Sequence, residues 1–178
     1  TGDAGNFWSW FGRYRRFPAR GRDGAGAFLG PTSGAMGYAL PAAIGAAFAA
    51  RASGLDVPVL AVAGDGGFLM TGQELETAVR HDLPVLALVF NNQSYGTIRM
   101  HQEREFPGRV SATALGPVDF AAFARALGER GARVADNRDF APALGRALDG
   151  RGPALIEVVT DAEQISVGTT ISALRAAR

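Results

Sequence analysis

Short apolar runs alternate along this chain with stretches in which apolar side chains recur at helical spacing. The continuous runs predict four buried strands, at 57–63, 84–90, 132–135 and 154–159. The helical spacing predicts helices from Phe68 to Val79, over 118–127, and around Phe140, Leu144 and Leu148. Apolar strands that alternate with amphipathic helices are typical of a parallel sheet covered on both faces. The pattern therefore predicts an α/β fold, with a doubly wound, mostly parallel sheet and helices on both faces.

The segment 35–51, AMGYALPAAIGAAFAAR, predicts a further helix rich in small residues. Such a face permits tight packing on the sheet, and it equally permits close contact with another domain or subunit. The sequence leaves both possibilities open. Pro41 is expected in the first turn or at a kink, because proline lacks the N–H that a helix interior uses.

Length and composition favour one compact domain. The chain has 178 residues, of which 47% are hydrophobic, and a net charge of +1, so we expect residues 1–178 to form a single domain. Because it begins with Thr1 rather than methionine, we expect a fragment of a longer, multi-domain chain. No apolar run approaches the roughly 20 residues that span a bilayer, and the first ten residues do not follow the basic-then-apolar plan of a signal peptide. We therefore expect a cytoplasmic protein that contacts neither membranes nor nucleic acid.

Two residue types are missing from the chain. The absence of cysteine excludes disulfides, iron–sulfur clusters, thiolate zinc sites and thiol nucleophiles. All 18 basic residues are arginine, which excludes a Schiff-base lysine and a Walker-type phosphate lysine. Any phosphate bound here must rely on backbone N–H groups, arginine or a metal.

Glycines surround an aspartate at the end of the first predicted strand. In Gly64-Asp65-Gly66-Gly67 the glycines let the backbone approach a ligand, and the start of the next helix attracts an anion. A carboxylate here repels phosphate unless a divalent cation lies between them. The alternative is that Asp65 only caps the helix.

A second polar cluster favours the metal. Asn91-Asn92-Gln93-Ser94 ends the neighbouring strand, so its side chains are expected at the same sheet edge as Asp65, where open parallel sheets bind ligands. Asparagine-rich strand ends are ordinarily turns. Paired with a carboxylate, however, an amide oxygen, a carbonyl, phosphate oxygens and water complete the octahedron that Mg²⁺ prefers.

These motifs, in this order, resemble the diphosphate-binding signature of thiamine diphosphate enzymes. Three stretches are similar to the C-terminal, diphosphate-binding domain of the acetolactate synthase-like group, namely SGAMGYALPAAIGAA, GDGGFLMTGQELETAV and NNQSYGTIRMHQE. The similarity covers nearly the whole chain, beginning at Asp3. It is specific for the cofactor class and not for the reaction.

The resemblance implies a set of ligands at the diphosphate end. Asp65, the Asn92 side chain and the Ser94 carbonyl would bind Mg²⁺, and the backbone of Gly66 and Gly67 would face the diphosphate. Family members often carry serine at the position of Gly67, so a hydroxyl contact is missing here.

The resemblance also implies residues for the rest of the cofactor. Met36 would support the bent cofactor conformation, and backbone groups of Gly34 and Met36 would bond to the pyrimidine; otherwise Met36 only fills the core. Asn6 and Phe7 stand where the family more often has glutamine or histidine near the diphosphate. The residues expected along the cofactor are Asn6, Gly96, Thr97 and Ile98. The segment 93–106 is expected to be a mobile loop without cofactor.

By the same resemblance, the intact enzyme would be a 2-keto acid carboligase or decarboxylase that acts on a keto acid or an aldehyde. No catalytic residue is expected within this chain, because the activating glutamate lies on a pyrimidine-binding domain of a second subunit. The resemblance thus implies a homo-oligomer, a dimer or tetramer, and predicts that the isolated chain is inactive. Acetolactate synthesis, another carboligation, decarboxylation and oxidation all stay open.

Two alternatives belong to other functional classes. One is a non-catalytic binding or assembly module on the same fold. The other is an NAD-binding domain, suggested by the glycine pattern at 24–30, although that pattern follows polar residues rather than a strand.

Several further residues carry weak signals. A basic run near Trp8, Trp10 and Tyr14 is expected to form a solvated or interdomain face; its members are Arg13, Arg15, Arg16, Arg20 and Arg22. We expect His81 near a helix end in water and Glu74 on a helix surface or interface. For His101, both a substrate-facing position and a surface position stay open.

Overall fold

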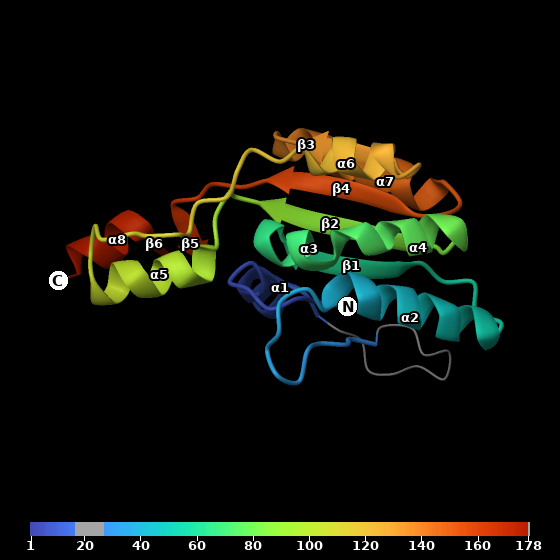
Figure 1. Cartoon of the computed structure of the whole chain (residues 1–178), viewed down its shortest axis with the longest axis horizontal. Helices are drawn as coiled ribbons and strands as arrows, with labels where there is room; N and C mark the ends of the chain where they lie inside the picture. The colour runs from blue at the N-terminus through green and yellow to red at the C-terminus, as the bar shows by residue number, and fades with distance from the viewer. Residues whose placement is uncertain (17–26, 178) are drawn as a thin grey trace.

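The computed structural model describes residues 1–16 and 27–177. Its centre is a four-stranded sheet in the order β1-β2-β4-β3, in which all neighbouring strands are parallel (Figure 1). All four predicted strands are present, with small shifts at their ends: β1 (Val59–Gly64), β2 (Val85–Asn91), β3 (Arg130–Val134) and β4 (Ala154–Val159).

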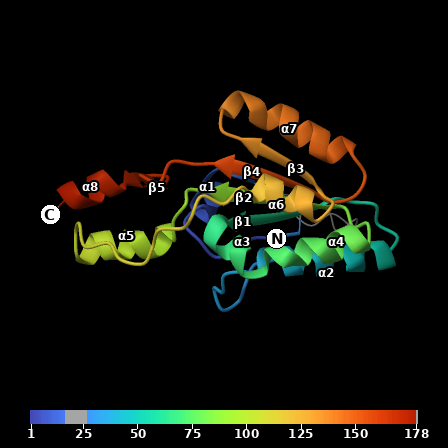
Figure 2. The same cartoon turned by 45° about the horizontal axis from the view of Figure 1, so that its top comes forward.

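Helices cover both faces of this sheet, as predicted (Figure 2). One face carries α2 (Ala39–Ala52), α3 (Asp65–Thr71), α4 (Leu75–Arg80) and α6 (Phe120–Ala126). The other carries α7 (Asn137–Asp149) and, against Phe90, α1 (Trp8–Tyr14). The connections explain this division. The connections from β1 to β2 and from β2 to β3 run across the sheet in one direction, whereas the connection from β3 to β4 runs back. Because such crossovers are right-handed, the helix of the returning connection, α7, lies on the opposite face from the helices of the other two.

The strands are buried on both sides because their residues alternate between two apolar layers. In β2, Val85, Ala87 and Val89 pack in the layer with α2, whereas Leu86 and Leu88 pack in the layer with α7. An uninterrupted apolar run is what such a central strand requires.

Two predicted helices differ in their bounds. The stretch from Phe68 to Val79 is divided into α3, the 3-10 turn η1 (Gly72–Glu74) and α4, and the Phe68 ring fills the space where a Gly72 side chain would stand. The predicted helix 35–51 begins only at Ala39, because Met36 and Gly37 form a turn. Pro41 lies in the first turn of α2, as expected.

Beyond the sheet, two helices form an arm (left in Figure 1). Contrary to the predicted loop 93–106, residues after Ser94 form α5 (Gly96–Glu105), which packs against α8 (Ile171–Ala176). A short hairpin of β5 (Gln164–Ser166) and β6 (Thr169–Thr170) leads to α8. Along the β1 edge of the sheet lie the first three residues, with Asp3 N donating to Val62 O at 2.9 Å. None of the helices in the described ranges is long and apolar enough to span a membrane.

Candidate cofactor site

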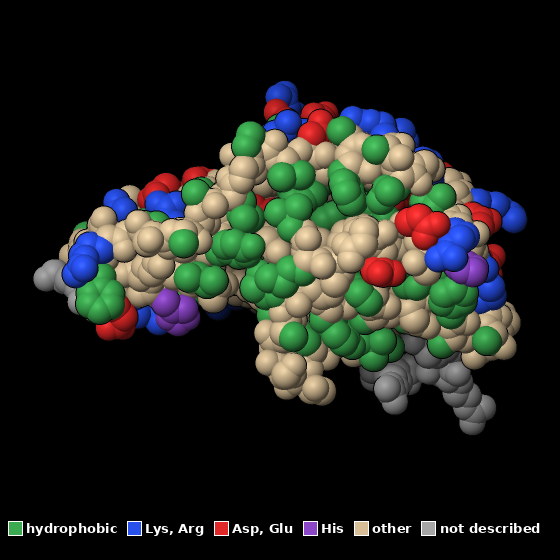
Figure 3. All heavy atoms as spheres, in the orientation of Figure 1, with side chains coloured by type: hydrophobic (Ala, Val, Ile, Leu, Met, Phe, Trp, Pro, Cys, Tyr) green, Lys and Arg blue, Asp and Glu red, His purple; other side chains and the backbone are tan. Residues whose placement is uncertain are grey.

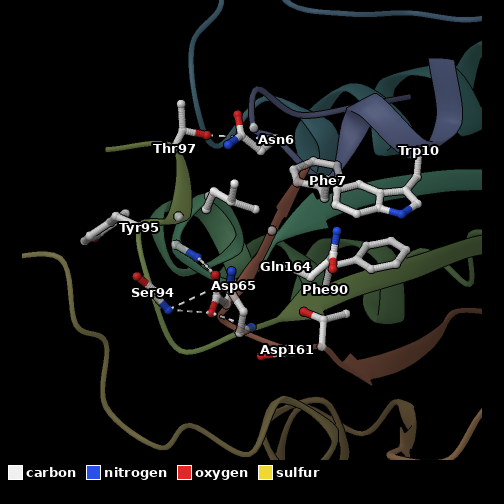
Figure 4. Close-up of a pocket in the computed structure, with 18 of the residues that line it drawn as sticks. Asn6, Phe7, Trp10, Asp65, Phe90, Ser94, Tyr95, Thr97, Asp161 and Gln164 are labelled. Atoms are coloured by element: carbon white, nitrogen blue, oxygen red, sulfur yellow. Dashed lines mark hydrogen bonds between the residues drawn. The ribbon is translucent and has the colours of Figure 1, made fainter. Parts of the chain in front are cut away.

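The carboxyl ends of β1, β2 and β4 open into a cavity of about 550 Å³ (Figure 4). Its size lies within the range of small-molecule sites. Most predicted site residues line it: Asn6, Met36, Asp65, Gly66, Gly67, Asn92, Ser94, Gly96, Thr97 and Ile98. Gly34 is not among the lining residues; it is exposed in the turn before Met36, with φ +66°.

Asp65 is fixed between two strand ends by backbone amides. Its Oδ1 accepts from Gly66 N at 2.8 Å, and its Oδ2 accepts from Asn92 N at 3.1 Å and Ser94 N at 3.2 Å. Burial raises the pKa of the Asp65 carboxyl above its usual value, and these amide bonds partly oppose the rise. The carboxylate therefore does more than cap α3, because it also joins β1 to the end of β2.

Side-chain oxygens of Asp65 and Asn92 lie near the same backbone amide. Asn92 Oδ1 accepts from Ser94 N at 3.1 Å, the same amide nitrogen that lies 3.2 Å from Asp65 Oδ2. The two side chains thus lie at the same edge of the sheet. A carboxylate, an amide oxygen and a nearby backbone carbonyl are the hard oxygen donors that suit Mg²⁺.

The charge of the cavity is negative. Asp65 and Asp161 are its charged lining residues, and no arginine or histidine from the described part of the chain lines it. The same part holds no group of three histidine, cysteine, aspartate or glutamate side chains suited to a metal, so a metal here would need the neutral oxygens and the ligand itself. A polyanionic ligand would be repelled from this cavity unless a cation came with it.

Aromatic and small residues shape the walls. Phe7 stacks on Phe90 with ring centroids 5.8 Å apart, and Trp10 extends the same wall (Figure 4). A Cβ on Gly66 would come within 2.5 Å of the Tyr95 ring and 3.5 Å of Met36 Cε. A larger residue at position 66 would therefore displace the Tyr95 ring, whereas Met36 would be at ordinary contact distance.

Asn6 and Thr97, both predicted along the cofactor, contact each other. The Asn6 N–H donates to Thr97 Oγ1 at 3.1 Å, and Asn6 Nδ2 lies 3.3 Å from Met100 Sδ. These contacts join the segment before α1 to the first turn of α5 across the mouth of the cavity.

Sequence reasoning missed part of the lining. The residues it did not find are Ala4, Gly5, Trp10, Phe90, Tyr95, Asn137, Val159, Thr160, Asp161, Gln164 and Ile165. Asp161 had the same signal as Asp65 and Asn92, a polar residue just past a predicted strand end. Trp10 and Gln164 had no such signal, because only the tertiary fold brings them to the cavity.

The weaker candidates lie outside the cavity. His81 is exposed at the end of α4, as expected, and His101 is exposed on α5 without lining the cavity. Glu74 accepts from the Thr77 hydroxyl at 3.1 Å, a helix-surface role. In the basic run, Arg13, Arg15 and Arg16 are exposed, whereas Arg20 and Arg22 lie outside the described residues.

The dinucleotide-binding pattern lacks its structural context. Residues 24–26 lie outside the described residues, and 27–30 form neither strand nor helix. Phe28 stacks on Trp8 with ring centroids 4.7 Å apart, and the next helix begins only at Ala39. A strand, glycine turn and helix are what that motif requires.

Comparison with known proteins identifies the family of this chain. The family model for the thiamine pyrophosphate enzyme C-terminal TPP-binding domain matches residues 3–158. The chain is 40% identical over 148 residues to a sulfoacetaldehyde acetyltransferase of Alcaligenes xylosoxydans xylosoxydans, which covers 83% of this chain and 23% of that protein. It is 34% identical over 161 residues to a catabolic acetolactate synthase of Raoultella terrigena, which covers 90% of this chain and 27% of that protein.

Among solved structures, benzoylformate decarboxylase from Polynucleobacter necessarius is similar with a TM-score of 0.73 and 31% identity, over 78% of this chain and 26% of that one. The chain thus spans about a quarter of the length of these relatives. The match over residues 3–158, on a fold that brings Asp65 and Asn92 together, shows that this chain belongs to the thiamine pyrophosphate enzymes as a C-terminal TPP-binding domain.

Proposed function

We propose that this domain holds the diphosphate of thiamine diphosphate through a Mg²⁺ ion bound by Asp65, the Asn92 side chain and the Ser94 carbonyl. The observation that carries the proposal is the charge of the cavity. Its charged lining residues are carboxylates, so a diphosphate needs a cation to bind there. The three oxygen donors sit at the strand ends where such an ion would lie between protein and phosphate.

Further residues would contact the rest of the cofactor. Gly66 and Gly67 would face the diphosphate with their backbone, and Met36 would support a bent conformation, with Gly34 and Met36 bonding to the pyrimidine. Asn6, Gly96, Thr97 and Ile98 would lie along the cofactor. When bound, thiamine diphosphate supplies a nucleophilic carbon and an electron sink next to a carbonyl. The residues of this chain bind it, orient it and keep water from its apolar side.

The intact enzyme, in this proposal, is a carboligase or decarboxylase of acetolactate synthase-like type that acts on a 2-keto acid or aldehyde. None of the glutamates in the described part lines the cavity. We therefore propose that a pyrimidine-binding domain of a second subunit supplies the activating glutamate, in a homo-oligomeric, dimeric or tetrameric, cytoplasmic enzyme.

Calorimetry on the intact enzyme tests the metal and the cofactor together. Heat of binding is expected when thiamine diphosphate and Mg²⁺ are both present. No heat is expected when EDTA is added, or when NAD takes the place of the cofactor. Asp65→Ala should abolish this binding and leave the far-ultraviolet circular dichroism native, because no core cavity is created.

Asp161→Asn is the matched control, since it removes the other carboxylate of the cavity without removing a proposed ligand. Its binding should be no weaker than that of the unaltered enzyme. Tight cofactor binding in EDTA, or by Asp65→Ala, would contradict the proposal and favour a metal-independent binding module.

A further inference from the structure

Asp3 is a buried carboxylate that the proposed function leaves without a role. Its side chain is only 3% exposed. Oδ2 accepts from Gly37 N at 2.9 Å, and Oδ1 accepts from Tyr38 N and Ala4 N, each at 3.1 Å. Tyr38 is the residue before α2, which has no side-chain cap of its own nearby in sequence. Asp3 therefore supplies the acceptor that the start of α2 lacks.

The turn that Asp3 binds is the one that carries Met36. Gly37 has φ +83°, a conformation that other residues rarely adopt, and its carbonyl accepts from Thr71 Oγ1 at 2.9 Å. The N–H side of Gly37 is thus tied to Asp3 and its C=O side to the end of α3. Because Met36 directly precedes Gly37 and lines the cavity, these bonds fix where its side chain enters.

The same carboxylate also touches the glycine turn after β1. A Cβ on Gly67 would lie 2.2 Å from Asp3 Oδ2, so a side chain at this position would displace the carboxylate. Asp3 thereby contacts two walls of the cavity, the turn with Met36 and the turn with Asp65.

We propose that Asp3 is a positioning residue that sets the place of Met36 relative to the metal-binding turn. The proposal rests on the proposed function. In that function the metal holds the cofactor at its diphosphate and Met36 supports its bend, so the distance between these two points matters. Loss of Asp3 leaves Asp65 and Asn92 with their own bonds, so the cofactor stays anchored. Met36, in contrast, loses its fixed position, and turnover should fall more than affinity.

Two variants of the intact enzyme test this split. Leucine at position 3 keeps the size and removes every acceptor, whereas asparagine keeps one oxygen. Asp3→Leu is expected to lower kcat about tenfold or more, since misplacement by a fraction of an ångström is costly in a catalytic site, and Asp3→Asn should lower it less. The Kd for thiamine diphosphate with Mg²⁺, from calorimetry, should change by less than about threefold in both.

A double-variant cycle separates positioning from general destabilisation. In a Met36→Ala background, Asp3→Leu should cause little further loss of kcat, because the side chain that Asp3 positions is already gone. The matched control is Asp119→Asn, which alters a carboxylate that caps α6 through Ala122 N at 2.7 Å but does not line the cavity. Its kcat should stay within about twofold of the unaltered value.

Multiplicative losses in the Asp3→Leu, Met36→Ala double variant, or an equal loss in Asp119→Asn, would overturn the proposal. Should Asp3→Leu fail to fold, Gly67→Ala serves instead, because it displaces the carboxylate without removing it; an unchanged kcat there would also overturn it. Failure of the proposed function would give a different result. The unaltered enzyme would not bind the cofactor, or Met36→Ala alone would leave kcat unchanged. The hydrogen bonds of Asp3 to the turn could still be detected in that case, because amide hydrogen exchange at Gly37 and Tyr38 should be faster in Asp3→Leu than in the unaltered enzyme.

Discussion

Buried carboxylates in this domain differ in their hydrogen-bond partners. Asp65 and Asp3 accept from backbone amides, and Glu157 accepts from Asn91 Nδ2 at 2.8 Å and Phe120 N at 3.1 Å. Each of these three joins segments that are distant in sequence. Glu129 is different, because neither of its buried oxygens has a hydrogen-bond partner in the described structure.

The pH dependence of stability follows from Glu129. Burial raises its pKa to about 8, only partly opposed by Arg130. The unfolded chain releases this proton near 4.5, so the folded chain binds more protons between these two values. Stability therefore falls as pH rises from about 4.5 to 8, and we expect a loss of roughly 2–4 kcal/mol between pH 5 and pH 8.

Urea unfolding of the chain at the two pH values measures this loss. In Glu129→Gln, which cannot ionise, most of the loss should disappear. Asp56→Asn, which changes an exposed carboxyl, should show the same loss of stability as the unaltered chain. An unaltered pH dependence in Glu129→Gln would show that the carboxylate finds a partner or water in solution.

The sequence predicted those residues of the site whose role depends on their place at a strand end. Asp65 and Asn92 follow apolar runs, and parallel strands bring such ends to one edge. Glu157 could not be predicted, since it stands inside an apolar run and is satisfied by residues from β2 and α6. Asp3 was equally hidden, because its partners lie 34 and 35 residues along the chain.

At the scale of elements, the pattern predicted all four strands and missed where helices break. Apolar periodicity continues through Gly72 and through Met36, but φ angles and side-chain packing there interrupt the helices. The arm was missed for another reason. The polar sequence of α5 resembles a loop, and its helix is held by contacts with α8.

The contact between α5 and α8 includes an ion pair between a buried glutamate and a half-exposed arginine. Glu103 is fully buried in α5 and accepts from two guanidinium nitrogens of Arg175, one at 2.8 Å, and from Gly108 N at 2.9 Å. The bond to Arg175, above all, lowers the pKa of Glu103 to about 2. Its contribution to stability is therefore complete above the ordinary value of 4.5 and is lost as pH falls toward 2.

Removing the arginine should release the arm. Arg175→Leu leaves the buried Glu103 charge without its main partner, which destabilises the packing of α5 against α8. We expect α5 and α8 to exchange amide hydrogens much faster, with the four sheet strands little changed. Arg138→Leu, which breaks an exposed pair with Asp136, is the control and should change neither. Equal protection of α5 in Arg175→Leu would contradict this account.

At the scale of the whole molecule, one face of this domain leaves an apolar surface exposed. Large apolar side chains are exposed on α3 and α6: Leu69, Met70 and Phe123. Figure 3 shows hydrophobic side chains gathered in the middle of this face. A surface of this kind is typical of contact with another domain or subunit.

We predict that the purified 178-residue chain has no carboligase or decarboxylase activity and binds thiamine diphosphate weakly. In the proposed function, pyrimidine activation needs a carboxylate held by another domain, and without that domain water competes for the diphosphate contacts. A 2-keto acid turnover assay with saturating cofactor and Mg²⁺ measures this. Robust turnover by the chain, free of intact enzyme, would mean that a catalytic base lies within these residues.

The covered edges of the sheet limit how any partner can attach. One edge, β1, is already paired with the first three residues of the chain, and the other, β3, is short and carries the exposed Arg130 and Arg133. Charged, short or occupied edges resist the addition of a foreign strand. We therefore expect neither strand exchange between copies nor fibre-like stacking from this domain. Its assembly should instead depend on side-chain complementarity between helices, which is a contact that can be formed and lost without unpairing any backbone.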